Sequence, residues 1–417
     1  MKRILGALGI FFGTIVGMLA LMTITSNLWE LTPWGGAHRR PLGPLPDPRL
    51  ELTTATRQVI IDAQPQPITT VIIEDTIYLP LAELAPLLGA TLEFDSGDNQ
   101  GRRLLLRRGQ ERLTLSLGSA IVESTSGFAL LDNPVVSVNN TFLVPLQLLQ
   151  EHLQVGLGVT PRAIYISNRP AGSIPVLVYH AILPDAETRL AGGNTYTSMY
   201  VLCSEVFHEQ MNYLYNSYFY TATLADLEDF LYRGRLLPEQ LVMLHFDDGF
   251  YCNIRYAYPI LKAYGFRATL FLITEKVAEL GDNQPPLDYG KLTWAALPSL
   301  VGTEDVFETA SHSHSLHRTQ EGDSTQTLLM TATQEEVRQD LLRSFEIISN
   351  HSAYSFPLSQ HTPAAISALR SSGVTMAFVG NYTYVTINSN PFNLERIGIA
   401  RSADFALFRD IVHRRMR

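Results

Sequence analysis

The sequence predicts an α/β protein in three parts: an N-terminal transmembrane helix, a small α/β domain with an internal repeat, and a larger domain built on a mostly parallel sheet or barrel. Three observations support this. An uncharged run follows two basic residues, a strand–proline–helix pattern occurs twice, and short apolar runs then alternate with helical patterns to the end of the chain. With 417 residues, the chain is long enough for two folded domains.

Residues 1–29 are predicted to be a membrane anchor. Lys2 and Arg3 precede an uncharged run that extends to Trp29, and about 20 apolar residues span a bilayer. The basic residues favour an N-terminus in the cytoplasm, so we expect a single-pass protein of the cell membrane with its folded domains outside the cytoplasm. The alternative is that residues 1–29 are a cleaved signal peptide, in which case the folded domains are still exported but carry no anchor. Residues 30–50 contain five prolines and are predicted to be an extended linker.

Charge and cysteine content narrow the possible partners. The net charge of −9 provides no basic face, so we expect no nucleic-acid partner, whereas a neutral or partly cationic substrate is tolerated. Cys203 and Cys252 are the only two cysteines, too few for a disulfide framework. They could form one bridge or remain isolated buried thiols.

Residues 51–168 are predicted to form a small domain with an internal repeat. The segments 75–89 and 140–153 both run through a turn, a short strand, a proline and an amphipathic helix, and they begin 65 residues apart. A proline suits the first turn of a helix, where no N–H is needed. Strand-like segments follow at 104–107 and 163–167. The pattern resembles the copper amine oxidase N-terminal-like domain. His152 is the only histidine in this part of the chain, so we expect a spacer or wall-binding module and no copper site.

Residues 174–417 are predicted to form the larger domain, after a boundary at 168–173. We expect strands at 174–179, 240–246 and 268–273, and helices at 204–216, 254–264, 335–349 and 364–372, the third with Thr333 as its N-cap. Alternating strands and helices favour a parallel sheet or barrel, whose functional site lies at the carboxyl ends of the strands.

The segment 240–246 runs directly into two adjacent carboxylates, Asp247 and Asp248, followed by Gly249. Two carboxylates at the exit of a buried strand cost desolvation and mutual repulsion. A bound cation or a role in proton transfer offsets that cost, and the structural alternative is a pair that caps the next helix. Gly249 permits a tight turn that exposes both side chains.

Three histidines, His312, His314 and His317, fall within six residues. A single histidine is usually a packed or surface residue, but a cluster in a chain with an aspartate pair favours a metal site. Two histidines and one carboxylate leave coordination positions open for water and substrate, which is typical of a catalytic metal.

These motifs resemble, in order and spacing, the NodB-type polysaccharide deacetylases (carbohydrate esterase family 4). Residues 246–250 and 258–273 look like the first motif of that family, and 292–294 with 311–317 like the second. The spacing of His312 and His317, and the opening segment 174–180, resemble the branch that deacetylates poly-β-1,6-N-acetylglucosamine. The resemblance covers about 174–400 and implies a distorted (β/α) barrel.

The resemblance also implies roles for individual residues. Asp248, His312 and His317 would hold a divalent metal, with Zn²⁺ expected, and Asp247 would be the general base. His180 would be the catalytic acid, the alternative being a histidine that only packs at a strand end. Arg396 would lie near the base, although a surface ion pair would look the same. A backbone N–H near position 250 would help to hold the oxyanion.

Four features of the sequence depart from the family pattern: three histidines and one motif. His245 stands where Thr or Ser is usual, on the strand face of Asp247, where it would alter the pKa of the base or pack. The third motif is reduced to residues 354–359. His314 is not counted as a ligand, and His413 lacks the context of the acid histidine found in other members.

The predicted function is a metal-dependent hydrolase that removes N-acetyl groups from an extracytoplasmic polysaccharide containing N-acetylglucosamine, either an exopolysaccharide or peptidoglycan. The alternative is a non-catalytic cell-wall or glycan-binding protein with a degenerate deacetylase domain, for which His245 and the altered third motif are the best support.

Overall fold

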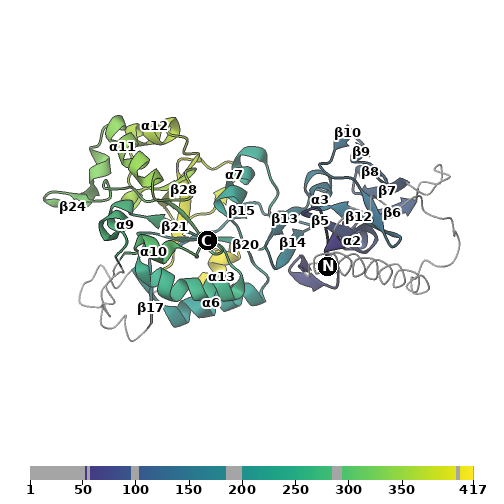
Figure 1. The fold of residues 1–417 in the computed structure, drawn as a ribbon, viewed down its shortest axis with the longest axis horizontal. Helices are drawn as coiled ribbons and strands as arrows, with labels where there is room; N and C mark the ends of the chain where they lie inside the picture. Colours follow the sequence, from purple (N-terminus) through teal and green to yellow (C-terminus); the bar gives the residue numbers. More distant parts are fainter. Residues whose placement is uncertain are drawn as a thin grey trace, which may run out of the picture. The chain divides into compact units, whose positions relative to one another are not determined.

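The computed structural model describes residues 52–53, 57–94, 103–184, 200–283, 294–400 and 404–416 (Figure 1). The predicted anchor at 1–29 and linker at 30–50 lie outside these residues. No helix within the described part of the chain is long and apolar enough to cross a membrane. The chain divides after Leu148 into two compact units, and residues 56–69 belong to the second of them.

The first unit contains two five-stranded antiparallel sheets. One has the strand order β1 (Leu52–Thr53), β4 (Val71–Ile73), β5 (Thr76–Pro80), β12 (Thr141–Pro145), β11 (Val136–Val138). The two copies of the predicted repeat meet here, because β5 pairs directly with β12, with Tyr78 opposite Pro145. Helices α2 (Leu81–Leu87) and α3 (Leu146–His152) follow these strands. The prolines end the strands, and Pro80 is the N-cap of α2.

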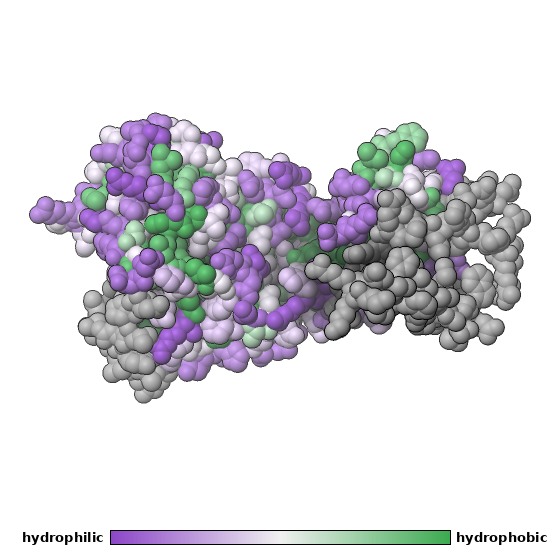
Figure 2. Space-filling model, viewed as in Figure 1, coloured by the Kyte–Doolittle hydropathy of each residue, from purple (hydrophilic) through white to green (hydrophobic). Residues whose placement is uncertain are grey.

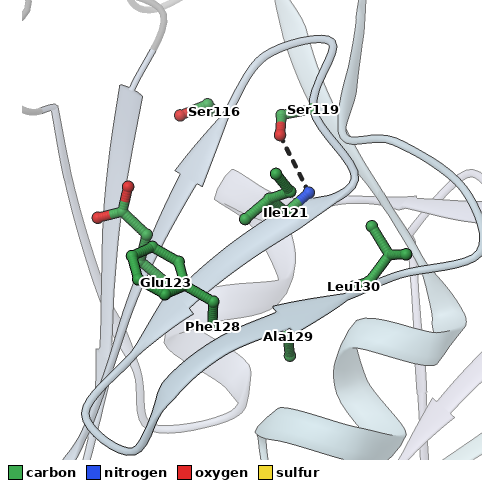
Figure 3. A pocket seen from close by; sticks show the side chains of 7 residues that line it. All are labelled: Ser116, Ser119, Ile121, Glu123, Phe128, Ala129 and Leu130. Carbon is green, nitrogen blue, oxygen red and sulfur yellow. Dashed lines mark hydrogen bonds between the residues drawn. The ribbon is translucent and has the colours of Figure 1, made fainter.

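The other sheet has the order β10 (Gly127–Leu130), β9 (Ile121–Ser124), β8 (Glu111–Ser116), β7 (Arg103–Arg108), β6 (Thr91–Phe94). The β9–β10 hairpin at its edge places Ile121, Phe128 and Leu130 on one face, with exposed fractions of 53%, 79% and 71%. Figure 2 shows the apolar patch over this hairpin. Figure 3 shows these side chains around an open cavity, with Ala129 pointing the other way. This edge of the first unit therefore presents apolar side chains to solvent.

The second unit begins with a four-stranded sheet that combines two distant segments. Its order is β13 (Gly156–Val159), β14 (Ala163–Ser167), β2 (Gln58–Ile61), β3 (Gln64–Gln66), and β14 pairs in parallel with β2. The backbone N–H of Leu157 donates to the carbonyl of Leu236 at 3.0 Å, and Gly156 lies against the backbone of Leu237. These contacts fasten the sheet to the rest of the second unit.

A closed barrel of parallel strands forms the centre of the second unit. Around the ring run β16 (Val176–Tyr179), β28 (Leu394–Gly398), β26 (Met376–Gly380), β25 (Ala353–Ser355), β22 (Phe307–Ser311), β21 (Ala268–Leu272) and β20 (Leu241–Phe246). The barrel closes because β16 pairs with both β28 and β20. Strand β19 (Tyr220–Thr221) also pairs with the beginning of β20. The predicted barrel is thus confirmed, and all strands of its ring end on one rim.

Helices surround the outside of this barrel (Figure 1): α6 (Ser204–Asn216), α7 (Leu224–Arg233), α8 (Tyr258–Tyr264), α9 (Thr274–Leu280), α10 (Leu297–Leu300), α11 (Gln334–Phe345), α12 (Pro363–Ser371) and α13 (Phe405–Val412). Short strand pairs complete the unit: β15 (Ser173–Ile174) with β27 (Val385–Thr386), β17 (Ala181–Leu183) with β18 (Val201–Cys203), and β23 (Thr319–Gln320) with β24 (Asp323–Thr327). Strand β20 is buried at all six positions, which explains why its sequence is an apolar run.

Two helix predictions are corrected in detail. The helix predicted at 254–264 begins with a π-helical turn, Asn253–Ala257, before α8. Pro259 lies in the first turn of α8 and has no N–H to donate to the preceding turn. The helix predicted at 335–349 ends at Phe345, because Ile348 turns into the core. Thr333 caps this helix as predicted, accepting a hydrogen bond from the N–H of Glu336.

Candidate active site

Asp247 and Asp248 lie at the carboxyl end of β20, and both are buried. Asp248 and Gly249 have φ of 71° and 81°, so the chain turns sharply as it leaves the strand. A Cβ at position 249 would lie 2.7 Å from Leu272, so the turn has room only for glycine. Left-handed backbone is costly for a residue other than glycine and is common at functional sites. The turn separates the two carboxylates.

His312 and His317 follow the end of β22, two strands along the ring from β20. Their Nε2 atoms lie 3.7 Å and 3.6 Å from Oδ1 of Asp248. Nδ1 of His312 lies 2.8 Å from the carbonyl oxygen of Ser355. A carbonyl only accepts, so Nδ1 carries the proton and Nε2 offers its lone pair toward Asp248. The structure therefore brings the three predicted ligands together.

These three residues fit a divalent metal ion. Their ligand atoms all lie within 4.8 Å of one another. Burial lowers the pKa of both His312 and His317 to about 4, so both rings are neutral near pH 7, as metal ligands must be. Burial also raises the pKa of Asp248, and a cation beside this carboxylate would offset the cost of ionising it.

Asp247 faces a different partner. Arg396, in the middle of β28, donates two hydrogen bonds to it, of 2.8 Å and 2.7 Å. Burial acts to raise the pKa of Asp247, but the guanidinium of Arg396, followed by the imidazole of His312, lowers it below its usual range. Asp247 is therefore ionised and held in one orientation. Arg396 is itself buried, so the predicted proximity to the base is present and the pair is not on the surface.

His180 follows directly after β16, the strand beside β20 and β28. Its ring lies against that of Tyr200, with centroids 4.5 Å apart. The side chain of Asn253 donates to the backbone carbonyl of His180 at 2.6 Å and accepts from the N–H of Ile182 at 3.2 Å. The electrostatic influence of His180 reaches both Asp247 and Asp248. The structure thus places this histidine at the rim that carries the ligands.

The departures from the family pattern have distinct surroundings. His245 is buried, and its ring packs against Phe271 and Phe378, with centroids 5.0 Å and 4.8 Å away. Burial, with Arg396 nearby, lowers the pKa of His245 well below its usual value, so the ring is neutral. His314 contacts Thr274, and His413 contacts Tyr213, so neither joins the ligand cluster.

Two residues that support the site had no role in the sequence-based predictions. Asp340, on α11, accepts hydrogen bonds from the backbone N–H groups of His314, Ser315 and Leu316 and from the hydroxyls of Ser313 and Ser315. Ser355 orients His312 through its carbonyl, and its hydroxyl accepts from Arg396 at 2.8 Å. Asp340 is buried on the same face of α11 as Val337 and Leu341, and this position on the apolar face of the helix was the only signal in the sequence. Ser355 lies in the reduced third motif.

Cys203 and Cys252 are not joined by a disulfide. The sequence left open either one bridge between them or two isolated thiols, and the structure has no bridge. Cys252 is buried and Cys203 partly buried, and neither belongs to the cluster of possible metal ligands found among the described residues.

Two protein-family models match the chain. The model for polysaccharide deacetylases matches residues 235–377, a range that contains both aspartates and both ligand histidines. The chain carries a polysaccharide deacetylase domain. The model for the copper amine oxidase N-terminal domain matches residues 57–162. Both predicted resemblances are confirmed, and with them the prediction of an enzyme of the deacetylase class.

Relatives of the deacetylase domain include a poly-beta-1,6-N-acetyl-D-glucosamine N-deacetylase of Staphylococcus aureus, which is 27% identical over 212 residues, 49% of this chain and 69% of that protein. YxkH of Bacillus subtilis is 31% identical over 113 residues, 27% of this chain. The match spans only 36% of YxkH.

Similar solved structures include a de-N-acetylase from Aggregatibacter actinomycetemcomitans, with 20% identity and a TM-score of 0.48, covering 57% of this chain and 99% of that one. IcaB from Ammonifex degensii has 18% identity and a TM-score of 0.45, covering 59% of this chain and 99% of its own.

Proposed function

We propose that this protein is a metal-dependent hydrolase that removes N-acetyl groups from a polysaccharide containing N-acetylglucosamine. The observation that carries the proposal is the pairing of two sites on one rim: a cluster of Asp248, His312 and His317 that suits a metal, and an ionised Asp247 beside it. The Staphylococcus aureus relative named for poly-beta-1,6-N-acetyl-D-glucosamine supports this substrate class, and peptidoglycan is the rival acetylated glycan.

Asp248, His312 and His317 would hold the ion, and Zn²⁺ suits a set of two imidazoles and one carboxylate. When bound, it supplies Lewis-acid chemistry, which acidifies water and polarises a carbonyl. Asp340 and Ser355 fix the loop and the ring that carry these ligands, which is how outer residues keep a metal site in one geometry.

The protons are moved by groups of this chain. Asp247, kept ionised and oriented by Arg396, accepts a proton from the water that attacks the acetyl carbonyl. A backbone N–H near Phe250, just after the turn, would donate to the developing oxyanion. His180 donates a proton to the departing amine, which is a poor leaving group as an anion. The products are acetate and a glucosamine unit that gains a positive charge.

The test is acetate release from acetylated glucosamine oligomers by the purified protein, with and without a chelator. Asp248→Ala and His312→Ala should lose both bound metal and acetate release. His314→Ala is the matched control, since His314 lies between the proposed ligands in the sequence but its ring is hydrogen-bonded to Thr274, and it should keep both. Asp247→Asn should keep the metal and lose about 10²–10⁴-fold in turnover. Acetate release at the wild-type rate by Asp248→Ala would refute the metal assignment.

A non-catalytic glycan-binding protein is the second candidate function, favoured by the reduced third motif and by the exposed apolar side chains of the β9–β10 hairpin. It predicts glycan binding with no acetate release from any glycan tried. We further propose a location at the cell membrane, with the folded domains outside the cytoplasm, on the strength of the uncharged run after Lys2 and Arg3. Fractionation of cells, with protease added from outside, tests it.

A further inference from the structure

Tyr382 combines two features that stability alone does not explain. It follows β26 at the rim of the barrel, its side chain is 68% exposed, and its backbone has φ of +63°. Left-handed backbone at a residue other than glycine is strained and is concentrated at ligand clamps and active sites. An exposed ring offsets little of that strain through core packing.

The surroundings of Tyr382 connect it to the site. Its N–H donates to the carbonyl of Arg396 at 3.2 Å, the residue that holds Asp247. Its ring lies beside Gly398, where an added Cβ would be 3.7 Å from the Tyr382 hydroxyl. Gly398 pairs with Val178, two residues before His180. Tyr382 therefore lies on the same stretch of rim as the proposed acid.

Tyr200 links this stretch to the metal ligands. Its ring contacts that of His180. Burial raises the pKa of Tyr200, and the neighbouring Tyr382 and Asp248 raise it further, so Tyr200 lies within electrostatic range of both. Two tyrosines thus flank the rim on the side of β26, β28 and β16.

The opposite arc of the ring, β20, β21 and β22, has a cavity of about 190 Å³. Asp248 and His317 line it, together with Phe250 and Trp294, whose rings are 5.9 Å apart. The cluster therefore borders an aromatic cavity on one arc of the rim, and Tyr382 lies on the other arc. A single sugar would not need both.

We propose that Tyr382 is a substrate-positioning residue whose ring stacks against a sugar unit next to the one that is deacetylated. This rests on the proposed function and narrows its substrate to a chain of sugars that crosses the mouth of the barrel. A pyranose ring presents an apolar face of C–H groups and a polar edge of hydroxyls. A tyrosine ring offers the matching apolar face and a hydroxyl that stays in water.

Two measurements test the inference. With acetylated oligomers of five sugars, Tyr382→Ala should raise KM about tenfold, the scale of one lost aromatic stacking contact, and leave kcat nearly unchanged. With the single sugar, kcat/KM should not change. Tyr382→Phe should resemble the wild type. Tyr215→Ala, which removes another half-exposed tyrosine on α6, should have no effect on either substrate.

Tyr382→Gly separates a binding role from a structural one. Glycine relieves the left-handed strain, so this variant should unfold at a temperature equal to or above that of the wild type and still bind the oligomer about tenfold more weakly. If Tyr382 were needed only for the fold, its replacement by glycine would lower the unfolding temperature.

Binding of the intact oligomer to an Asp247→Asn background, measured by calorimetry, keeps this inference separate from the proposed function. Absence of acetate release by the wild type overturns the function but not the subsite. Equal oligomer affinity with and without Tyr382, or no oligomer binding at all, overturns the subsite.

Discussion

The adjacent carboxylates of Asp247 and Asp248 have different charge states favoured by different partners. Asp247 and Asp248 share a strand end, yet the first faces the guanidinium of Arg396 and the second faces two neutral imidazoles. One is kept ionised, and the other has its pKa raised by burial. The difference follows from the turn at Asp248 and Gly249, which directs the two side chains to different neighbours.

The two ligand histidines make the stability of the metal-free protein depend on pH. Their pKa values are about 4 in the folded chain, against about 6.5 when unfolded. Between these values the unfolded chain binds protons that the folded chain does not, so the free energy of unfolding falls as the pH falls. The expected loss is about 1.4 kcal/mol per pH unit for each histidine.

This slope is measured by denaturant unfolding of protein that has been freed of metal with a chelator, at several pH values between 7.5 and 4. Other groups titrate in the same range, so the comparison is with the His312→Asn, His317→Asn double variant, which should have a shallower slope. Equal slopes in the two proteins would contradict the lowered pKa values.

At the scale of elements, helix α11 holds the loop 313–317, which carries His317, through the side chain of Asp340. Asp340→Ala should weaken Zn²⁺ binding about 10–100-fold, the usual effect of removing a partner of metal ligands, although no ligand is removed. Glu335→Ala is the control, because Glu335 is on the same helix and pairs only with exposed groups. Competition with a chromogenic chelator gives both affinities, and equal affinities would show that the loop is held by other contacts.

The sequence predicted the site better at strand ends than away from them. The aspartate pair and the histidine cluster are local patterns, so they could be read directly, and Arg396 could be placed by its motif. Asp340 could not be assigned, because an acid on an amphipathic helix usually faces solvent. The contribution of Ser355 to His312 comes from a backbone carbonyl, which any residue type would provide.

At the scale of the whole molecule, the second unit includes a sheet that the sequence did not attach to it. Parallel pairing of β2 with β14 brings Gln58 beside Ala163, and such a contact has no local signature. A Cβ at Gly156 would lie 2.2 Å from the carbonyl oxygen of Leu237. Close packing at this point therefore depends on the absence of a side chain.

Gly156→Ala should lower the free energy of unfolding of the second unit by about 1–3 kcal/mol, as overpacking does. Gly172→Ala is the matched control, since nothing lies within 4 Å of its added Cβ. Thermal unfolding compares the two variants with the wild type. If Gly156→Ala unfolds like the control, the sheet is not part of the cooperative structure.

Barrel closure by β16 has a consequence for the order in which the chain is made. Strand β16, which His180 follows, is made well before its partner β28, and Arg396 on β28 lies 149 residues beyond Asp247. A growing chain that has reached His317 holds Asp248 and both histidines of the cluster before it can close the ring or pair Asp247 with Arg396. Contacts between such distant segments form slowly. A chain that has not yet reached Arg396 therefore can neither pair Asp247 nor close the ring.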